Sequence, residues 1–308
     1  MKNAGGEGKM WYCSLNEALR RSYGTKVYKL ALSCVNTCPN RDGTVGDRGC
    51  IFCTGAGEFA ESGPVSEQLL RAKARLADKI TAETRYVAYF QSFTNTYASI
   101  ETLRRAFFAA IEPEDVVALS IATRPDCLGA EVLSLLSEVN RRKPVWVEMG
   151  LQTTNPATAR YIRRGCDLAA FDAAIERLRS IGITVILHQI IGLPGETAED
   201  IFATADYIAH AGVQGVKFHL LYVAEGTDLA EEYRQGRVRI LEPEEYFSLL
   251  SGCIRRMPPE MVIHRLTGDG AKRNLLAPLW SGNKKWVLNG IRRYFTEHDV
   301  VQGSLYQR

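Results

Sequence analysis

The sequence predicts an α/β fold, a partial (β/α)6 barrel followed by a C-terminal extension. Short β-branched and aromatic runs alternate with longer segments of helical period, which is typical of repeated βα units around a parallel sheet. Glycines stand where two of the helices should end, at Gly182 and Gly212. Cysteine and polar motifs follow the strand-like runs, and the carboxyl ends of strands are where such folds carry their functional sites.

The expected elements alternate along residues 26–225. We expect strands at Lys26–Leu32, Arg85–Gln91, Val116–Thr123, Val145–Gln152, Thr184–Gly192 and Gly215–Val223. Between them we expect helices at Glu67–Ile80, Ile100–Ala110, Ala130–Val139, Leu168–Ile181 and Glu196–Ala211. The pattern breaks down after about Glu225. The predicted organisation is therefore an N-terminal segment 1–25, a barrel 26–225 with a long loop at 33–62, and an extension 226–308 that partly closes the barrel mouth.

Composition narrows the class of protein. The chain has 308 residues, of which 46% are hydrophobic and 24% charged, so it has enough apolar material for one large domain. It contains no apolar run long enough for a membrane span and no signal-peptide core, so we expect a cytoplasmic protein with no membrane partner. Eight cysteines are too few for a disulfide scaffold of this size, which favours metal binding or redox chemistry.

Charge is unevenly distributed along the chain. Residues 253–308 carry a net charge of +6, whereas the first 252 residues carry −3. Four basic residues stand in two adjacent pairs beside aromatic residues: Lys284, Lys285, Arg292 and Arg293. Such a segment suits contact with a polyanion, and a solvated basic face is the alternative.

Four of the eight cysteines follow the first predicted strand, at Cys34, Cys38, Cys50 and Cys53. Cys50 and Cys53 can reach one centre from a tight turn, and Cys38 supplies a third thiolate across a glycine-rich loop. Three ligands would leave one iron of a [4Fe–4S] cluster open for a further ligand. With Cys34 added, the same segment could instead form a closed zinc site. We favour the cluster, because the loop stands at the mouth of a barrel whose other strand ends also carry polar motifs.

Several long motifs extend the argument to the whole chain. They include CPNRDGTVGDRGCIFC, YVAYFQSFTNTY, WVEMGLQT, IIGLPGET and HRLTGDGAKRNLLAPLW. In these motifs the chain resembles the YhcC/YtqA group of radical S-adenosylmethionine (SAM) proteins. It is also similar to the radical SAM domain of Elongator's catalytic subunit and, more distantly, to oxygen-independent coproporphyrinogen oxidase.

The resemblance implies a fold, two cofactors and a reaction class. The fold would be a TIM-like radical SAM partial barrel. The cofactors would be a [4Fe–4S] cluster on Cys38, Cys50 and Cys53 and SAM at the open iron. The reaction would be reductive cleavage of SAM followed by hydrogen abstraction from a substrate, with an electron donor such as flavodoxin or ferredoxin as partner.

The resemblance also suggests residues that bind SAM. Phe52 occupies the aromatic position that lies near the adenine. Glu148, Gly150 and Gln152 share one side of a strand by its two-residue period, and the resemblance implies that Gln152 meets the ribose hydroxyls. Arg164 follows Gln152 by twelve residues, a spacing similar to that of an arginine that binds the SAM carboxylate in relatives.

The fifth and sixth strands supply further candidates. His188 falls where relatives place a polar ribose contact, and Gly192 would let the backbone approach the ligand. Lys217 and His219 share one face of strand six, and Leu220 or Leu221 could cover the adenine. Each of these side chains could instead have a purely structural role in packing or hydrogen bonding.

The second strand departs from many radical SAM enzymes. Those enzymes carry a Gly-Gly-Glu-like segment for the methionine amino group, whereas this chain reads YFQSFT over residues 89–94. Gln91 or backbone carbonyl groups would take that role here.

Two lines suggest tRNA as substrate, through a side chain on a wobble uridine. The Elongator radical domain acts on that base, and some YtqA-like relatives are associated with the same position. The basic C-terminal segment offers phosphate contacts beside Trp280, Trp286 and Tyr294. The alternatives are radical chemistry on a small metabolite, and an iron–sulfur or zinc regulator that binds nucleic acid.

Overall fold

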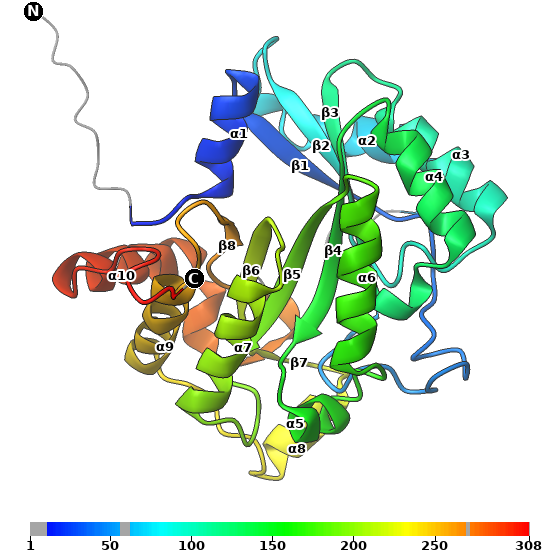
Figure 1. Cartoon of the computed structure of the whole chain (residues 1–308). Helices are drawn as coiled ribbons and strands as arrows, with labels where there is room; N and C mark the ends of the chain where they lie inside the picture. The colour runs from blue at the N-terminus through cyan, green and yellow to red at the C-terminus, as the bar shows by residue number, and fades with distance from the viewer. Residues whose placement is uncertain (1–10, 56–61, 269–271, 308) are drawn as a thin grey trace, which may run out of the picture.

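The centre of the computed structural model is a sheet of seven parallel strands in the order β1-β2-β3-β4-β5-β6-β8. The structure describes residues 11–55, 62–268 and 272–307, so parts of the predicted N-terminal segment and cluster loop lie outside it. The strands are β1 (Val27–Leu32), β2 (Arg85–Phe90), β3 (Val116–Thr123), β4 (Val145–Gln152), β5 (Thr184–Ile191), β6 (Gly215–Leu220) and β8 (Val262–Arg265). The sheet curls into an incomplete barrel (Figure 1).

Helices cover the outer face of the curled sheet (Figure 1). They are α2 (Val65–Ala74), α3 (Ile100–Ile111), α4 (Ala130–Asn140), α6 (Leu168–Ser180) and α7 (Ala198–His210). Side chains cap several of them: Ser99 accepts a hydrogen bond at the start of α3, Asp167 does so for α6, and Thr197 forms a capping box with Asp200 on α7. These caps fix where each helix leaves its loop.

The predicted fold class is confirmed, and the structure adds one strand to it. All six expected strands are present, and β3 and β4 have the expected bounds. The seventh, β8, comes from the segment assigned to the extension and pairs with β6 through Val216 and Ile263. It has only four residues, too few for a periodic pattern to stand out in the sequence. The boundary at residue 226 stays a prediction.

The rest of the C-terminal region packs beside the barrel. It contains β7 (Val223–Ala224), α8 (Asp228–Arg234), α9 (Pro243–Arg256), β9 (Leu275–Ala277) and α10 (Lys284–Glu297). A further short helix, α5 (Pro156–Tyr161), belongs to the barrel and follows β4. β7 and β9 form a two-stranded antiparallel sheet. Helix α9 contacts both α7 and α10. Among the described residues, no helix has the length and apolarity that a membrane crossing requires.

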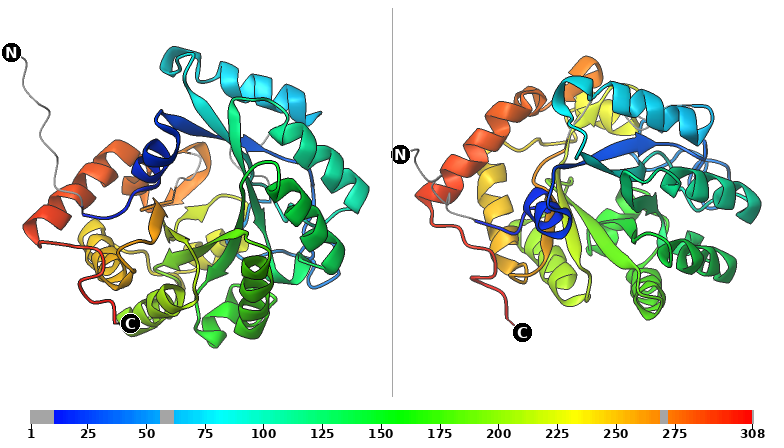
Figure 2. Two further views of the ribbon diagram at one scale, coloured as in Figure 1. Left: turned by 45° about the horizontal axis from the view of Figure 1, so that its top comes forward. Right: turned by 90° about the horizontal axis from the view of Figure 1, so that it is seen from above.

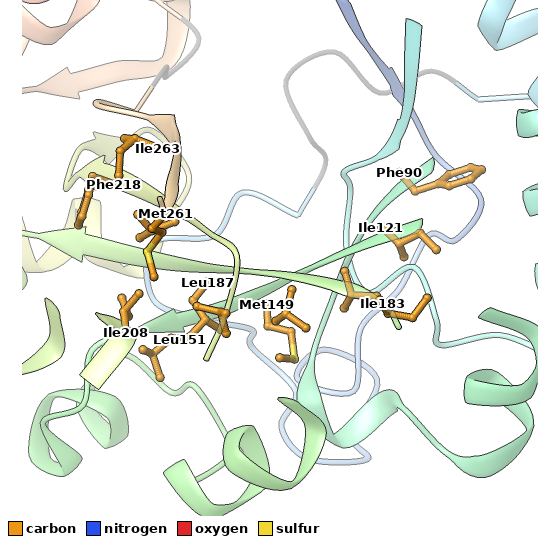
Figure 3. Close-up of a cluster of buried hydrophobic side chains, with 14 of the residues drawn as sticks. Phe90, Ile121, Met149, Leu151, Ile183, Leu187, Ile208, Phe218, Met261 and Ile263 are labelled. Atoms are coloured by element: carbon orange, nitrogen blue, oxygen red, sulfur yellow. The ribbon is translucent and has the colours of Figure 1, made fainter. Parts of the chain in front are cut away.

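Most of the hydrophobic core lies between the sheet and its outer helices. Alternate residues of the strands point outward into it, including Phe90, Ile121, Met149, Leu187 and Phe218, all fully buried (Figure 3). Burial of this layer is the main apolar contribution to stability, at roughly 25 cal/mol per Å² removed from water. The inward-facing residues are therefore available for a site.

Helix α1 (Leu15–Tyr23) closes the amino end of the barrel. It lies between β1 and β8 (Figure 2) and contacts both of them. Its buried Leu19 packs in a small cluster with Val27, Val87 and Ala118. A capping box at Ser14 starts the helix and Gly24, at φ 70°, ends it. Among the described residues, α1 thus covers this end of the barrel with apolar contacts.

We predict that Leu19→Ala lowers the free energy of unfolding by about 2–4 kcal/mol, because it leaves a cavity among buried side chains. Leu70→Ala is the matched control, since Leu70 is also a helical leucine but is 68% exposed. Urea unfolding followed by circular dichroism measures both. Equal losses in the two variants would contradict the role given to α1.

Candidate functional site

A cavity of about 640 Å³ opens at the carboxyl ends of the strands. It is bounded by the loop that follows β1 and by inward-facing residues of the strands. The sequence-predicted site residues that line it are Cys38, Cys50, Phe52, Cys53, Gln91, Glu148, Gln152, Arg164, His188, Lys217 and Lys284. The fold thus brings together residues that are up to 246 positions apart in the sequence.

Three cysteines of the loop face this cavity, and a donor stands beside each sulfur. The Thr94 hydroxyl donates to Cys38 Sγ at 3.2 Å, the backbone N–H of Gly55 to Cys53 Sγ at 3.3 Å, and the Asn40 amide to Cys50 Sγ at 3.5 Å. Such donors stabilise thiolate ligands and tune the centre that they hold. Without a bound centre, burial raises the pKa of the Cys50 thiol to about 11.

The fourth cysteine of the loop stands apart from the other three. Cys34 lines a separate pocket with Val35 and Pro64, and its thiol donates to the Asn95 side chain at 3.6 Å. Burial raises its pKa to about 12. No three His, Cys, Asp or Glu side chains of the described residues are grouped closely enough to hold a single metal ion. The placement of Cys34 therefore favours the three-cysteine set over the four-cysteine zinc site.

Local contacts fix the shape of the cysteine loop. Asn40 is 4% exposed and donates to the Arg163 carbonyl at 2.5 Å, which ties the loop to the end of α5. The Arg41 guanidinium donates to the Cys53 carbonyl at 2.5 Å and lies against Gly49. Gly49 has φ 74°, and a Cβ there would come 2.8 Å from Arg41 Nε, so both conformation and space require glycine.

Below the cysteines, six strands each project one polar side chain into a single layer. These side chains are Lys29, Tyr89, Ser120, Glu148, His188 and Lys217, from β1 to β6 in order. Glu148 Oε1 accepts from Lys29 Nζ and from the Ser120 hydroxyl, both at 2.5 Å. Glu148 Oε2 accepts from Lys217 Nζ and lies 3.0 Å from His188 Nε2. One fully buried carboxylate thus connects four other strands.

Burial and the charge of Glu148 shift the pKa values of the side chains in this layer. Burial alone would raise the pKa of Glu148, but the adjacent Lys217 and Lys29 ammonium groups hold it well below its usual value. Burial lowers the pKa of Lys217 to about 7, against the attraction of Glu148. Burial likewise lowers the pKa of His188 to about 4, so this imidazole is neutral at pH 7. The layer is an ion cluster with more cations than anions.

Comparison with known proteins decides the family. The model of the radical SAM superfamily matches residues 34–208, and the model of the radical SAM C-terminal domain matches residues 213–297. This chain belongs to the radical SAM superfamily. It is 41% identical to YtqA of Bacillus subtilis over 96% of this chain and 93% of that protein. It is 38% identical to YhcC of Escherichia coli over 94% of each, so the expected group is confirmed.

More distant radical SAM relatives connect the chain to Elongator. The tRNA uridine(34) acetyltransferase of Methanocaldococcus jannaschii is 28% identical over 50% of this chain and 28% of that protein. The solved structure of the archaeal Methanocaldococcus infernus Elp3 superposes with a TM-score of 0.69 at 18% identity, covering 90% of this chain and 64% of that one. This last likeness is one of fold. The superfamily match places the chain among radical SAM enzymes.

The donor set fits the cofactors that the family implies, a [4Fe–4S] cluster and SAM. Each cysteine of such a cluster binds a different iron, so three sulfurs around one cavity are suitable ligands. Each sulfur has a polar donor, and Phe52, Gln91 and Gln152 line the same cavity. Gln152 has φ 67°, and its amide folds back over Gly150, where a Cβ would come 2.5 Å from Gln152 Nε2.

Arg164 was predicted to bind the carboxylate of SAM. Its side chain is 5% exposed, and its guanidinium makes hydrogen bonds within the protein. Its guanidinium donates to the backbone carbonyls of Leu151, Thr153 and Cys166 at 2.6–2.9 Å. It also lies over the Phe171 ring, 5.1 Å from the centroid. It therefore holds the end of β4 as well as lining the cavity.

Several predicted site residues lie away from the cavity. Leu220 is on the opposite face of β6 from Lys217 because strand residues alternate, and it packs in the outer core. Leu221 belongs instead to a second buried cluster that includes Ile51 of the cysteine loop. Gly192, at φ 95°, lines a different pocket, and a Cβ there would come 2.8 Å from Leu241.

The predicted basic residues of the C-terminal segment divide into two groups. Lys284, at the start of α10, lines the cavity, whereas Lys285, Arg292 and Arg293 are exposed on the outside of that helix. Arg293 lies 3.9 Å from Glu244 and from Glu297. The segment thus runs from the cavity rim onto the outer surface.

The structure also reveals site residues that the sequence prediction missed. Lys29 carried a readable signal, since a lysine inside an apolar strand needs a buried partner. Asn40 and Thr94 carried no such signal in the sequence, because their contacts with the cysteines depend on how two loops meet in the folded protein. Arg265 was missed because β8 was not recognised as a strand of the barrel.

We predict that Ala in place of Cys38, Cys50 or Cys53 abolishes iron incorporation. Each of these sulfurs faces the cavity with a donor beside it, and an open-iron cluster cannot lose another ligand. The measurement is iron content and visible absorption after anaerobic reconstitution. Cys34→Ala is the matched control and should retain the cluster. A cluster that survives Cys38→Ala but not Cys34→Ala would show that the ligand set is wrong.

Proposed function

We propose that this radical SAM enzyme holds a [4Fe–4S] cluster on Cys38, Cys50 and Cys53 and modifies the side chain of a wobble uridine in tRNA. The observation that carries the cofactor assignment is the convergence of three cysteines, but not Cys34, on one cavity. The cavity volume of about 640 Å³ leaves room for SAM together with a small part of a larger substrate.

When bound, the two cofactors supply reductive cleavage of the SAM sulfonium and hydrogen abstraction from the substrate, with flavodoxin or ferredoxin as the proposed electron donor. The chain's own residues position the reactants and exclude water. Phe52, which packs beside Ile51 and Leu221, gives the adenine an apolar wall. The amides of Gln91 and Gln152 face the cavity and can hold the polar groups of SAM.

Two observations support a tRNA substrate. Among the distant relatives is a protein whose name specifies uridine 34 of tRNA, and it is similar to half of this chain. In addition, α10 carries Lys284 at the cavity rim and then Lys285 and Arg292 along its exposed side. A phosphate backbone that follows this helix would reach the cavity.

The target base would have to leave its stack to enter the barrel. Unstacking costs least in a single-stranded loop, which suits an anticodon. Trp286 is 47% exposed on α10 between the basic residues, and its ring centroid lies 6.3 Å from that of Trp280. This pair offers an apolar surface on which an unstacked neighbouring base could rest.

We predict that changing Lys284, Lys285, Arg292 and Arg293 to Ala weakens tRNA binding by about tenfold or more at low salt and flattens its salt dependence, because fewer phosphates are neutralised. Filter binding over a range of salt concentrations measures this. Cluster content and 5′-deoxyadenosine formation with dithionite should stay at the parent level, because the four residues lie outside the cysteine loop.

The control removes four exposed basic residues from elsewhere on the molecule: Lys79, Arg105, Arg141 and Arg179. It should bind tRNA nearly as tightly as the parent. Equal weakening in both variants would show that only net charge matters, and no weakening in either would remove the physical support for a tRNA substrate. A wobble-uridine profile that is unchanged by deletion of the gene would contradict the proposed substrate directly.

A further inference from the structure

Arg163, two residues after α5, has a backbone conformation that is rare for a residue with a side chain. Its φ is 57°, in the left-handed region that glycine adopts freely and other residues adopt at a cost. Its N–H donates to the Arg160 carbonyl at 3.0 Å. A strained residue persists where the surrounding contacts hold it, and it often marks a functional site. The contacts of Arg163 therefore indicate what its conformation is for.

The carbonyl group of Arg163 meets the cysteine loop. It accepts a hydrogen bond from the Asn40 side-chain amide at 2.5 Å, and the same amide nitrogen donates to Cys50 Sγ at 3.5 Å. An amide nitrogen carries two hydrogens, so it can make both contacts at once. The carbonyl oxygen itself lies 3.7 Å from Cys50 Sγ. With Arg163 in this conformation, its carbonyl orients the amide so that the second N–H points at the sulfur.

The side chain of Arg163 is held from the other direction, by Asp228 of α8. Its guanidinium donates to Asp228 Oδ2, and Arg48 Nη2 of the cysteine loop lies 2.9 Å from Asp228 Oδ1. Hydrogen bonds from the two arginines hold the pKa of Asp228 below its usual value, so the carboxylate is charged at neutral pH. One carboxylate thus connects α8 to the turn after α5 and to the cysteine loop.

Backbone hydrogen bonds follow the same route. The N–H of Ile51 donates to the Ile162 carbonyl at 3.3 Å, and the N–H of Leu229 donates to the Ile51 carbonyl at 2.8 Å. Ile51 stands between Cys50 and Cys53 in the sequence. The tight turn that carries two of the three cysteines is therefore held between the end of α5 and the start of α8.

Glycine at position 163 would serve a purely structural turn better than arginine, because it adopts φ 57° without strain. The side chain is what glycine cannot supply, and that side chain bonds to Asp228. The strained conformation is thus maintained by a contact with α8. Its effect is felt at the Asn40 amide, on the opposite side of the turn.

We propose that Asp228 is a positioning residue for the cluster, which acts on its reduction potential through Arg163 and the hydrogen bond to Cys50. The inference rests on the cluster assignment of the proposed function. Hydrogen bonds to cluster sulfurs raise the reduction potential, because they stabilise the more negative, reduced state. Asp228 lies in the segment 213–297 that matches the radical SAM C-terminal domain, whereas the cysteines lie in the superfamily match. One domain thus adjusts the cofactor that the other holds.

The test is a redox titration of the reconstituted protein, followed by the EPR signal of the reduced cluster, with iron content measured on each sample. Asp228→Asn keeps the shape of the side chain but weakens its hold on Arg163. The equilibrium constant for reduction should become about tenfold smaller, a shift of about 59 mV to lower potential for one electron. The sign is informative, because loss of a nearby negative charge would by itself raise the potential. Iron content should stay at the parent level.

Two changes at Arg163 separate its backbone from its charge. Arg163→Ala should shift the potential as Asp228→Asn does, because alanine does not favour the left-handed conformation. Arg163→Gly should stay within about threefold of the parent equilibrium constant, because glycine adopts that conformation without Asp228. Glu231→Gln is the matched control for charge, since Glu231 lies on the same helix and contacts Gln235 instead. It should not lower the potential.

Each other outcome has a distinct meaning. An unchanged or higher potential in Asp228→Asn, at parent iron content, would overturn the inference and leave the three-cysteine cluster standing. Loss of iron from Asp228→Asn would also overturn it, since Asp228 would then hold the loop rather than adjust the potential. Equal shifts in Arg163→Ala and Arg163→Gly would overturn the route through the backbone. A parent protein that takes up no iron would overturn the cluster assignment and the inference together.

Discussion

One buried carboxylate organises the interior of this half-barrel. Glu148 accepts hydrogen bonds from side chains of β1, β3 and β6 and contacts His188 of β5. Tyr89 of β2 is connected to it indirectly, through a hydrogen bond with Lys217. Two lysines can lie inside the curled sheet only because this carboxylate faces them, since a buried ammonium group without a partner is costly. The same contacts join strands that are not neighbours in the sheet, so the ion cluster supports the curvature that creates the cavity.

This layer separates two parts of the barrel with different tasks. On the amino side, α1 and its buried Leu19 seal the interior with apolar contacts. On the carboxyl side, the cysteine loop faces the open cavity and takes its shape from Asn40, Arg41 and a left-handed Gly49. The rigid sheet lets a long, irregular loop hold three sulfurs in place, as is usual for sites at the carboxyl ends of parallel strands.

The sequence allowed much of the fold to be predicted, because alternation and helical period are local properties. The strands and their helices follow from them, and the seventh strand was missed because its four residues hold no periodic signal. Leu220 was predicted near the adenine, but it is the last residue of β6, and alternation along the strand puts it opposite Lys217 in the outer core. The shared bonds of Glu148 join residues up to 119 positions apart, and local patterns cannot reveal such pairings.

The most direct test of the central role of Glu148 is the free energy of unfolding of Glu148→Gln. The amide keeps the shape but leaves two buried ammonium groups without a counter-charge, so a loss of about 3–5 kcal/mol is expected. Glu138→Gln is the control, because Glu138 pairs with Arg104 on the surface and should have a much smaller effect. A loss below about 1 kcal/mol for Glu148→Gln would show that the ion cluster does not hold the barrel together.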